Sequence, residues 1–297
     1  MEKKEVSLEE CMSCSTSPKS KSLQRRLLGK LAFGAGFLGM NSAWSASGLS
    51  VAENRVNIET KDGLCDAYFI CPDQGKYPGV LMWTDIRGLR PSFIAMGRRL
   101  ASEGYSVLIP NPFYRASAAP IPAPDFDYSN PEQRAQARKL VAQLFFGNNA
   151  EKDTKVFLEF LQGQIEVDNT KKMGASGYCM GGPLVIRSAA SFPDAIGAAA
   201  SFHGGGLVTE KDNSPHLLIP QIKANVLIAI ASNDDEREPE TKKVLKGMFQ
   251  REEVNADIEV YEEALHGWCV TDSSVYNQVK AEVAWKNLLQ LYKKSLI

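Results

Sequence analysis

Short apolar runs alternate with amphipathic segments from about residue 53 onward, and this alternation limits the fold more than any other feature of the chain. The runs at 80–83 and 226–230 are apolar throughout, as expected for strands covered by helices on both faces. No helix-length segment separates the first two strand-like runs, so we expect them to form an antiparallel edge hairpin. The pattern predicts an α/β protein with a mostly parallel sheet.

The boundaries of the elements follow from the same pattern. Strands are predicted at 55–59, 64–70, 79–84, 106–110, 172–177, 195–202, 225–231 and 257–261. Helices are predicted at 93–103, 131–146, 151–162, 181–191, 239–251 and 276–294. The longest irregular stretch is the proline-rich segment 111–130, and a loop of that length in a compact domain usually lines or covers a site.

The composition is that of an ordinary globular protein, with 44% hydrophobic and 23% charged residues. The formal net charge is -1, and no cluster of Lys and Arg lies beyond the first thirty residues, so nucleic-acid binding is not expected. Neither a repeat nor a long linker divides the chain after its N-terminal segment. We therefore expect one domain over residues 48–297.

The N-terminal segment 1–47 has the layout of an export signal. Basic residues precede an apolar, glycine-rich stretch, and small residues follow it. Arg25-Arg26 resembles a twin-arginine signal, and cleavage is expected between residues 43 and 47. We expect a periplasmic or otherwise exported domain without stable membrane insertion, with the twin-arginine or general export machinery as partner. The alternatives are an uncleaved amphipathic or anchoring helix, and a cytoplasmic protein if the signal is not functional.

The cysteines leave two questions about disulfides and metals. Cys11-x-x-Cys14 lies inside the predicted signal and is weak evidence for zinc or thiol redox chemistry. Cys65 and Cys71 could form a disulfide in an oxidising compartment, a point that geometry decides. No cluster of His, Cys and carboxylates has the spacing of metal ligands, so no metal or organic cofactor is expected.

The turn Gly177-Tyr178-Cys179-Met180-Gly181 carries the strongest chemical signal. It stands between an apolar strand and a helix-like segment, where a G-x-nucleophile-x-G turn needs small residues because the helix passes close to the strand. At the N-terminal end of that helix, the positive end of the dipole favours a thiolate at Cys179. A buried structural cysteine in a glycine-rich turn is the alternative.

The partners of a catalytic triad follow in the order that such a turn requires. The strand predicted at 225–231 leads into Asp234 and Asp235, and His266 follows the last predicted strand. Either acid could orient the imidazole, and we favour Asp234 because it comes first after the strand. His203 and His216 do not follow the pattern and are expected to be loop or core residues.

An acyl-transfer site also needs donors for the negative charge that develops on the substrate oxygen. The backbone N–H of Met180, directly after the nucleophile, is one candidate. The backbone N–H of Ile86, in the loop after the strand predicted at 79–84, is the other. Neither donor needs a particular side chain, so residue identity does not test this expectation.

With these residues in view, the chain resembles the dienelactone hydrolase family of the α/β-hydrolase fold over most of residues 53–295. The likeness rests on the turn around Cys179, on His266-Gly267-Trp268, on the acidic loop after the strand at 225–231, and on Asp85. It implies hydrolysis of cyclic enol-lactones and related esters through a cysteine nucleophile. Asp85 matches a family position whose acid contacts the resting thiol, with an ion pair to Arg87 as the alternative.

The resemblance also suggests how substrate is held. Arg115 matches one of two family arginines that bind a substrate carboxylate, but Cys269-Val270-Thr271 stands where the second is expected. The resemblance therefore leaves open whether a carboxylated dienelactone is the substrate. Asp85, Arg115 and Trp268 are the predicted substrate-binding residues, and an apolar pocket wall is expected from four aromatic residues, namely Trp83, Phe113, Tyr114 and Trp268.

The leading hypothesis is a thiol hydrolase of small esters or lactones that works through an acyl-enzyme on Cys179, with Asp234 and His266. A non-catalytic protein of the same fold that binds a small ligand or a partner is the second hypothesis. A redox dithiol protein that uses Cys11 and Cys14 is the third.

Overall fold

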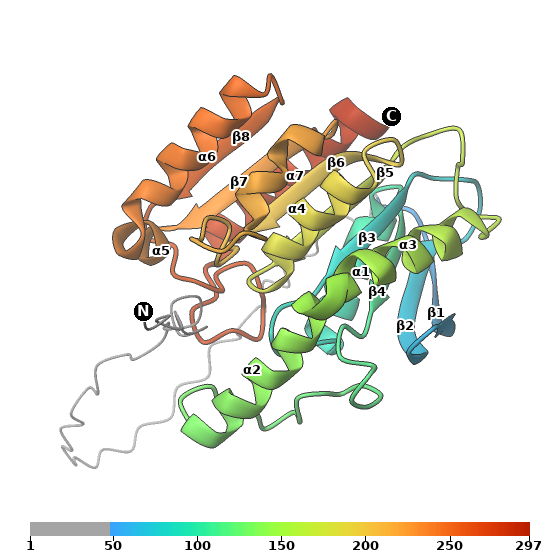
Figure 1. Cartoon of the computed structure of the whole chain (residues 1–297). Helices are drawn as coiled ribbons and strands as arrows, with labels where there is room; N and C mark the ends of the chain where they lie inside the picture. Colours follow the sequence, from blue (N-terminus) through green and yellow to red (C-terminus); the bar gives the residue numbers. More distant parts are fainter. Residues whose placement is uncertain (1–47) are drawn as a thin grey trace, which may run out of the picture.

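The computed structural model describes residues 48–297. The predicted export signal, including Cys11 and Cys14, lies outside these residues. Within the described range, eight strands form one sheet in the order β1-β2-β4-β3-β5-β6-β7-β8 (Figure 1). The strands are β1 (Val51–Thr60), β2 (Gly63–Pro72), β3 (Gly79–Trp83), β4 (Ser106–Pro110), β5 (Met173–Tyr178), β6 (Ile196–Phe202), β7 (Asn225–Ala231) and β8 (Ala256–Tyr261).

The pairing of the strands confirms the predicted topology. β1 and β2 form an antiparallel hairpin, and its tight turn uses Gly63, whose φ of +134° a side chain would rarely adopt. β2 pairs antiparallel with β4, whereas every pair from β4 to β8 across the sheet is parallel. β3, β4, β5 and β6 are buried at every position, as the continuous apolar runs indicate.

Helices cover both faces of the sheet (Figure 1). They are α1 (Pro91–Ser102), α2 (Pro131–Phe145), α3 (Asn149–Gln162), α4 (Gly181–Ser191), α5 (Ser232–Arg237), α6 (Pro239–Arg251) and α7 (Gln278–Leu296), with 3-10 turns η2 (Phe146–Asn148) and η3 (Pro215–Gln221). All six predicted helices are present, with ends shifted by at most two residues. The acidic segment after β7, expected to be a loop, forms the short helix α5.

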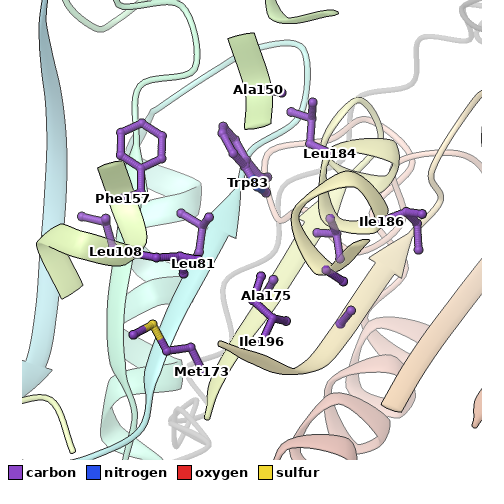
Figure 2. Close-up of a cluster of buried hydrophobic side chains, with 14 of the residues drawn as sticks. Leu81, Trp83, Leu108, Ala150, Phe157, Met173, Ala175, Leu184, Ile186 and Ile196 are labelled. Carbon is purple, nitrogen blue, oxygen red and sulfur yellow. The ribbon is translucent and has the colours of Figure 1, made fainter. Parts of the chain in front are cut away.

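Each face of the sheet has its own hydrophobic core. On one face, Trp83 packs edge-on against Phe157 of α3 at 5.7 Å between ring centroids, close to Leu184 of α4 (Figure 2). On the other face, α1 and α7 cover the sheet, and Phe93 of α1 meets Tyr178 at 5.5 Å. Burial on both faces therefore holds the sheet rigid, so the loops at its strand ends start from defined positions.

The geometry decides against a disulfide between Cys65 and Cys71, a question that the sequence left open. Both thiols are free and buried, and both residues lie on β2. Six residues of extended strand separate their Cα atoms by roughly 20 Å, whereas a disulfide needs about 4.4–6.8 Å. Among the described helices, none combines the length and apolarity needed to cross a membrane.

Candidate active site

Cys179 occupies the sharp turn between β5 and α4. Its φ of +52° lies in the left-handed region, which a residue with a Cβ adopts only when its surroundings enforce it. Glycines make the turn possible. A Cβ on Gly177 would lie 2.1 Å from the carbonyl oxygen of Gly181, and one on Gly181 would lie 2.7 Å from that of Trp83. The small residues therefore bring the helix against the strand and lift the thiol above the end of the sheet.

His266 reaches this turn from the segment after β8. Its Nδ1 lies 2.7 Å from Oδ2 of Asp234, and its backbone N–H donates to the side chain of Asn233 at 2.9 Å. Asp234 lies on α5 and is 8% exposed. Asp235 instead forms an ion pair with Lys242. The structure thus brings Asp234, and not Asp235, to the imidazole.

The thiol and the imidazole also meet. Burial alone would lower the pKa of His266, but a negative charge on Cys179 and hydrogen bonds with Asp234 and Cys179 raise this pKa well above its usual value. Because Nδ1 faces Asp234, Nε2 is the nitrogen left for the thiol. The contacts therefore favour a positively charged imidazolium on His266 beside the sulfur of Cys179.

The two expected oxyanion donors lie next to this pair. Met180 directly precedes α4, and Ile86 lies in the segment after β3 and lines the same pocket as Cys179. Neither backbone N–H donates a hydrogen bond to another residue of the described range. Both donors are therefore available for a substrate oxygen.

A pocket of about 450 Å³ opens above Cys179. Its wall comes from the segments that follow β3 to β8, so it lies at the carboxyl ends of the strands, where α/β sheets bind their ligands. The irregular stretch 111–130 contributes Phe126 and Tyr128 to this wall, as its length led us to expect. A volume of this size suits a small organic molecule.

Asp85 lines the pocket but has neither of the contacts expected for it. Arg90 donates to both of its carboxylate oxygens, at 2.6 and 2.8 Å, and the backbone N–H of Arg87 donates to Oδ1 at 2.8 Å. Within the described chain no hydrogen bond joins Asp85 to Cys179. The guanidinium groups of Arg90 and Arg87 also bind Asp272, in the segment after β8. Asp85 is therefore held in a network of alternating charges at the pocket wall.

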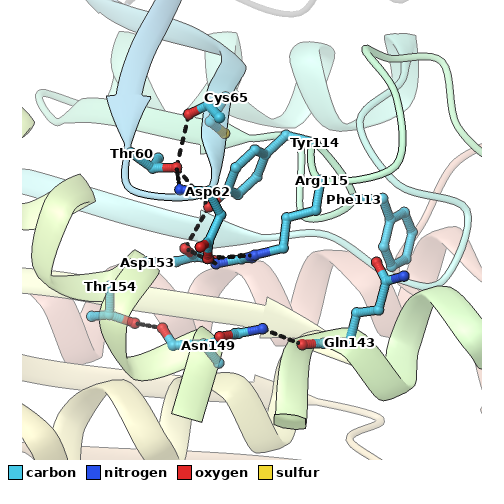
Figure 3. A network of polar contacts seen from close by, with 12 residues as sticks. Thr60, Asp62, Cys65, Phe113, Tyr114, Arg115, Gln143, Asn149, Asp153 and Thr154 are labelled. Carbon is cyan, nitrogen blue, oxygen red and sulfur yellow. Dashed lines mark hydrogen bonds and ion pairs between the residues drawn. The ribbon is translucent and has the colours of Figure 1, made fainter. Parts of the chain in front are cut away.

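Arg115, one of the predicted substrate-binding residues, is not among the residues that line the pocket. Its guanidinium pairs with Asp153 of α3 at 2.7 Å and with Asp62 of the β1–β2 turn at 2.7 Å (Figure 3). Tyr114 donates to the same Asp153 at 2.8 Å. These contacts tie α3 to the edge hairpin and engage all three nitrogens of the Arg115 guanidinium with Asp62 or Asp153.

The four aromatic residues expected to wall the pocket are buried core residues, and none of them, Trp268 included, is among the residues that line this pocket. Trp83 donates from Nε1 to Ser188 at 3.1 Å, and Trp268 is fully buried and stacked on Tyr261. Phe113 and Tyr114 are buried as well. The sequence patterns of a core aromatic and a pocket aromatic are the same, because both follow strands as apolar residues.

Sequence reasoning missed two residues of the site. Arg90, which binds Asp85, precedes α1 and could have been found as a cation following an acid by five positions. His203 follows β6; it is buried as expected, but it also lines the pocket, and its ring lies 5.1 Å from that of His266. Its place after a parallel strand was the available signal. No group of His, Cys, Asp and Glu in the described residues is arranged to hold a metal ion.

Comparison with known proteins gives the same identification as the geometry. The family model of the dienelactone hydrolases matches residues 65–296. Protein usf of Aquifex pyrophilus is 26% identical over 248 residues, 80% of this chain and 96% of that protein. The carboxymethylenebutenolidase of Rhodococcus opacus is 22% identical over 229 residues, 75% of this chain and 84% of that protein.

A solved structure extends the comparison to the fold. A dienelactone hydrolase-like promiscuous phosphotriesterase from metagenomic libraries superposes with a TM-score of 0.69 at 21% identity, covering 84% of this chain and all of that one. Its likeness concerns the fold, which is the α/β-hydrolase fold. The chain therefore belongs to the dienelactone hydrolase family, whose members are hydrolases of ester and lactone bonds.

Proposed function

We propose that this protein hydrolyses small esters or lactones through an acyl-enzyme on Cys179, with His266 as the proton carrier and Asp234 as the residue that orients it. The observation that carries the proposal is the chain of contacts from Asp234 through His266 to Cys179, at the base of the pocket. Family membership gives the bond class, and the geometry supports the roles of the residues.

In the first half of the reaction, the Cys179 sulfur attacks the carbonyl carbon of the substrate. The carbonyl oxygen becomes negative and accepts hydrogen bonds from the backbone N–H groups of Ile86 and Met180. His266 then gives its proton to the leaving oxygen. An ester thereby releases a neutral alcohol, whereas the opened lactone ends in a neutral hydroxyl group that stays attached to Cys179 through its acyl chain. Asp234 stabilises the imidazolium before this transfer and keeps Nδ1 protonated after it.

In the second half, water replaces the leaving group. His266, now neutral, takes a proton from the water molecule, and the resulting hydroxide attacks the thioester carbon. The same two N–H groups bind the new oxyanion, the carbon–sulfur bond breaks, and the carboxylic acid leaves. The thiolate on Cys179 and the imidazolium on His266 are restored.

The pocket favours small substrates without an obligatory carboxylate. Its three guanidinium groups each face a carboxylate, since Arg87 and Arg90 bind Asp272, and Arg237 binds Asp234 at 3.0 Å. Phe126 and Tyr128 offer apolar surface to an acyl or aryl group.

The test is hydrolysis of phenyl acetate and of a simple lactone by the purified protein. Replacement Cys179→Ala is expected to abolish phenol release, because no nucleophile remains. Cys179→Ser is expected to retain only a small fraction of the activity, because a hydroxyl ionises far less readily than a thiol. Cys269→Ala is the matched control, since Cys269 is a buried cysteine away from this pocket, and it is expected to keep the activity.

Activity that survives Cys179→Ala contradicts the proposal. Reaction with iodoacetamide at neutral pH separates catalysis from simple binding. Cys179 is the partly exposed one of the four described cysteines, so it should be alkylated first, and alkylation should remove the activity. Slow alkylation together with an inactive wild type would instead favour a non-catalytic ligand-binding protein.

A further inference from the structure

His203 makes a direct contact with the nucleophile turn. It follows β6, has a φ of +41°, and anchors its own backbone N–H on the carbonyl of Ala229 at 2.8 Å. Its Nδ1 accepts a hydrogen bond from the backbone N–H of Cys179 at 3.1 Å, a donor that Cys179 also shares with the carbonyl of Phe202 at 3.0 Å. The ring is thus fixed in place at one of its two nitrogens.

This contact determines the proton position on the ring. A nitrogen that accepts a hydrogen bond carries no proton, so the neutral imidazole of His203 bears its proton on Nε2. Burial, and to a smaller extent the positive charge of His266, lower the pKa of His203 well below its usual value, against the smaller opposing effect of a hydrogen bond to the residue's own backbone. The ring therefore stays neutral while His266 is charged, and the contact with Cys179 favours the proton on Nε2.

This donor has no acceptor within the described protein. Nε2 of His203 is buried and has no hydrogen-bond partner there. The residue is only 1% exposed, and it lines the pocket above Cys179. A buried donor without a partner is costly in a folded protein, and at the wall of a substrate pocket a hydrogen bond to bound substrate would remove that cost. The neighbouring ring of His266, 5.1 Å away, is the one that protonates the leaving oxygen.

We propose that Nε2–H of His203 donates a hydrogen bond to the leaving-group oxygen of the bound ester or lactone, as a further catalytic residue of this site. The proposal rests on the hydrolase function above. Ile86 and Met180 bind the carbonyl oxygen, while His203 lies on the side of His266, where the second oxygen of the ester is released. His203 keeps its proton throughout, and His266 supplies the proton that the leaving oxygen gains.

Two substitutions distinguish the role of Nδ1 of His203 from that of Nε2. His203→Asn places an amide oxygen where Nδ1 accepts from Cys179 but has no donor at the Nε2 position, and asparagine tolerates the positive φ. His203→Gln places an amide group where Nε2 lies but loses the acceptor for Cys179. The experiment measures kcat/KM of the full chain on acetates whose leaving groups range from p-nitrophenol through phenol to a simple alcohol.

The expected result is a loss that depends on the leaving group. His203→Asn should lower kcat/KM about 10- to 100-fold for the alkyl acetate, whose oxygen becomes strongly basic, and much less for the p-nitrophenyl acetate. For each variant, the loss of kcat/KM on the alkyl acetate is divided by the loss on the p-nitrophenyl acetate. This ratio should be smaller for His203→Gln than for His203→Asn. The rate of Cys179 alkylation and the melting temperature of His203→Asn should stay close to wild type.

An equal loss on all acetates, or a parallel loss of Cys179 alkylation, overturns the proposal, because His203 would then act only on the position of the nucleophile. These outcomes are distinct from failure of the hydrolase function. That failure is seen in the wild type, as hydrolysis that is absent or insensitive to Cys179→Ala, and it overturns both proposals.

Discussion

At the scale of single residues, the site depends on two residues whose backbone is held in the left-handed region. Cys179 has a φ of +52° and His203 a φ of +41°, and the N–H of the first donates to the ring of the second. Each such backbone costs on the order of 1–3 kcal/mol, and it persists because neighbouring contacts enforce it. The two residues directly follow the adjacent strands β5 and β6, so the strain supports the position of the thiol.

The pair Asp234 and Asp235 offers a test at this scale. Asp234→Asn removes the charge that supports the imidazolium of His266, and it is expected to lower kcat by about 10²- to 10⁴-fold. Asp235→Asn is the matched control, because this neighbour binds Lys242 instead and should leave kcat within about twofold of wild type. Steady-state kinetics on phenyl acetate measure both. Equal losses in the two variants would remove Asp234 from its assigned role.

At the scale of elements, Arg90 joins the two segments that carry the site. It binds Asp85, next to the oxyanion donor Ile86, and with Nε and Nη2 it binds Asp272 at 2.8 and 3.0 Å, six residues after His266. The segment after β3 is thereby tied to the segment after β8, although three strands of the sheet, β5, β6 and β7, lie between β3 and β8. Contacts of this kind hold the oxyanion donor Ile86 and the base His266 in fixed positions relative to each other.

The pH dependence of stability tests this cross-tie. Burial would raise the pKa of Asp272, but hydrogen bonding to Arg90 and the charges of Arg90 and Arg87 lower it below its usual value. A lowered folded pKa means that the stabilisation is present above the ordinary value of about 3.9 and is lost as the pH falls through the lowered one. Asp272→Asn should therefore reduce the unfolding free energy by about 1 kcal/mol at neutral pH, and by progressively less below pH 4.

Urea unfolding at a series of pH values measures this difference. Asp194→Asn is the control, because Asp194 pairs with Lys223 at the surface, where its side chain is 87% exposed and salt screens the pair. A constant difference between wild type and Asp272→Asn from neutral pH down to pH 3 would contradict the charge-based account of the tie.

At the scale of the whole molecule, one sheet carries both cores and all the segments of the site. Helices α1 and α7 cover one face, and α3, α4 and α6 cover the other, so the strand ends cannot shift separately. The pocket draws on six of these strand ends. Loss of either core should therefore remove the site together with the fold.

We expect a chain that begins at Gly48 to retain the melting temperature and the phenyl acetate hydrolysis of the full chain. The two cores and the pocket wall described above are built from residues 48–297, and we propose that residues 1–47 serve as the export signal. Differential scanning calorimetry should show a single transition for the shorter chain. A shorter chain that is unfolded or inactive would show that the N-terminal segment contributes to the domain.

The sequence by itself determined the elements and the order of the chemical groups. Alternating apolar runs predicted the strands, and the glycines around Cys179 predicted the sharp turn, because periodicity and the absence of a Cβ are local properties. The same reasoning placed an acid after β7 and a histidine after β8.

Tertiary structure decided which side chains meet. It selected Asp234 over Asp235, gave Asp85 to Arg90, turned Arg115 toward Asp153, and set His203 beside His266. Most of these pairings join residues that lie far apart in the chain, and all of them depend on the direction in which each loop leaves its strand. That direction is set by packing against the rest of the molecule, which a local pattern does not contain.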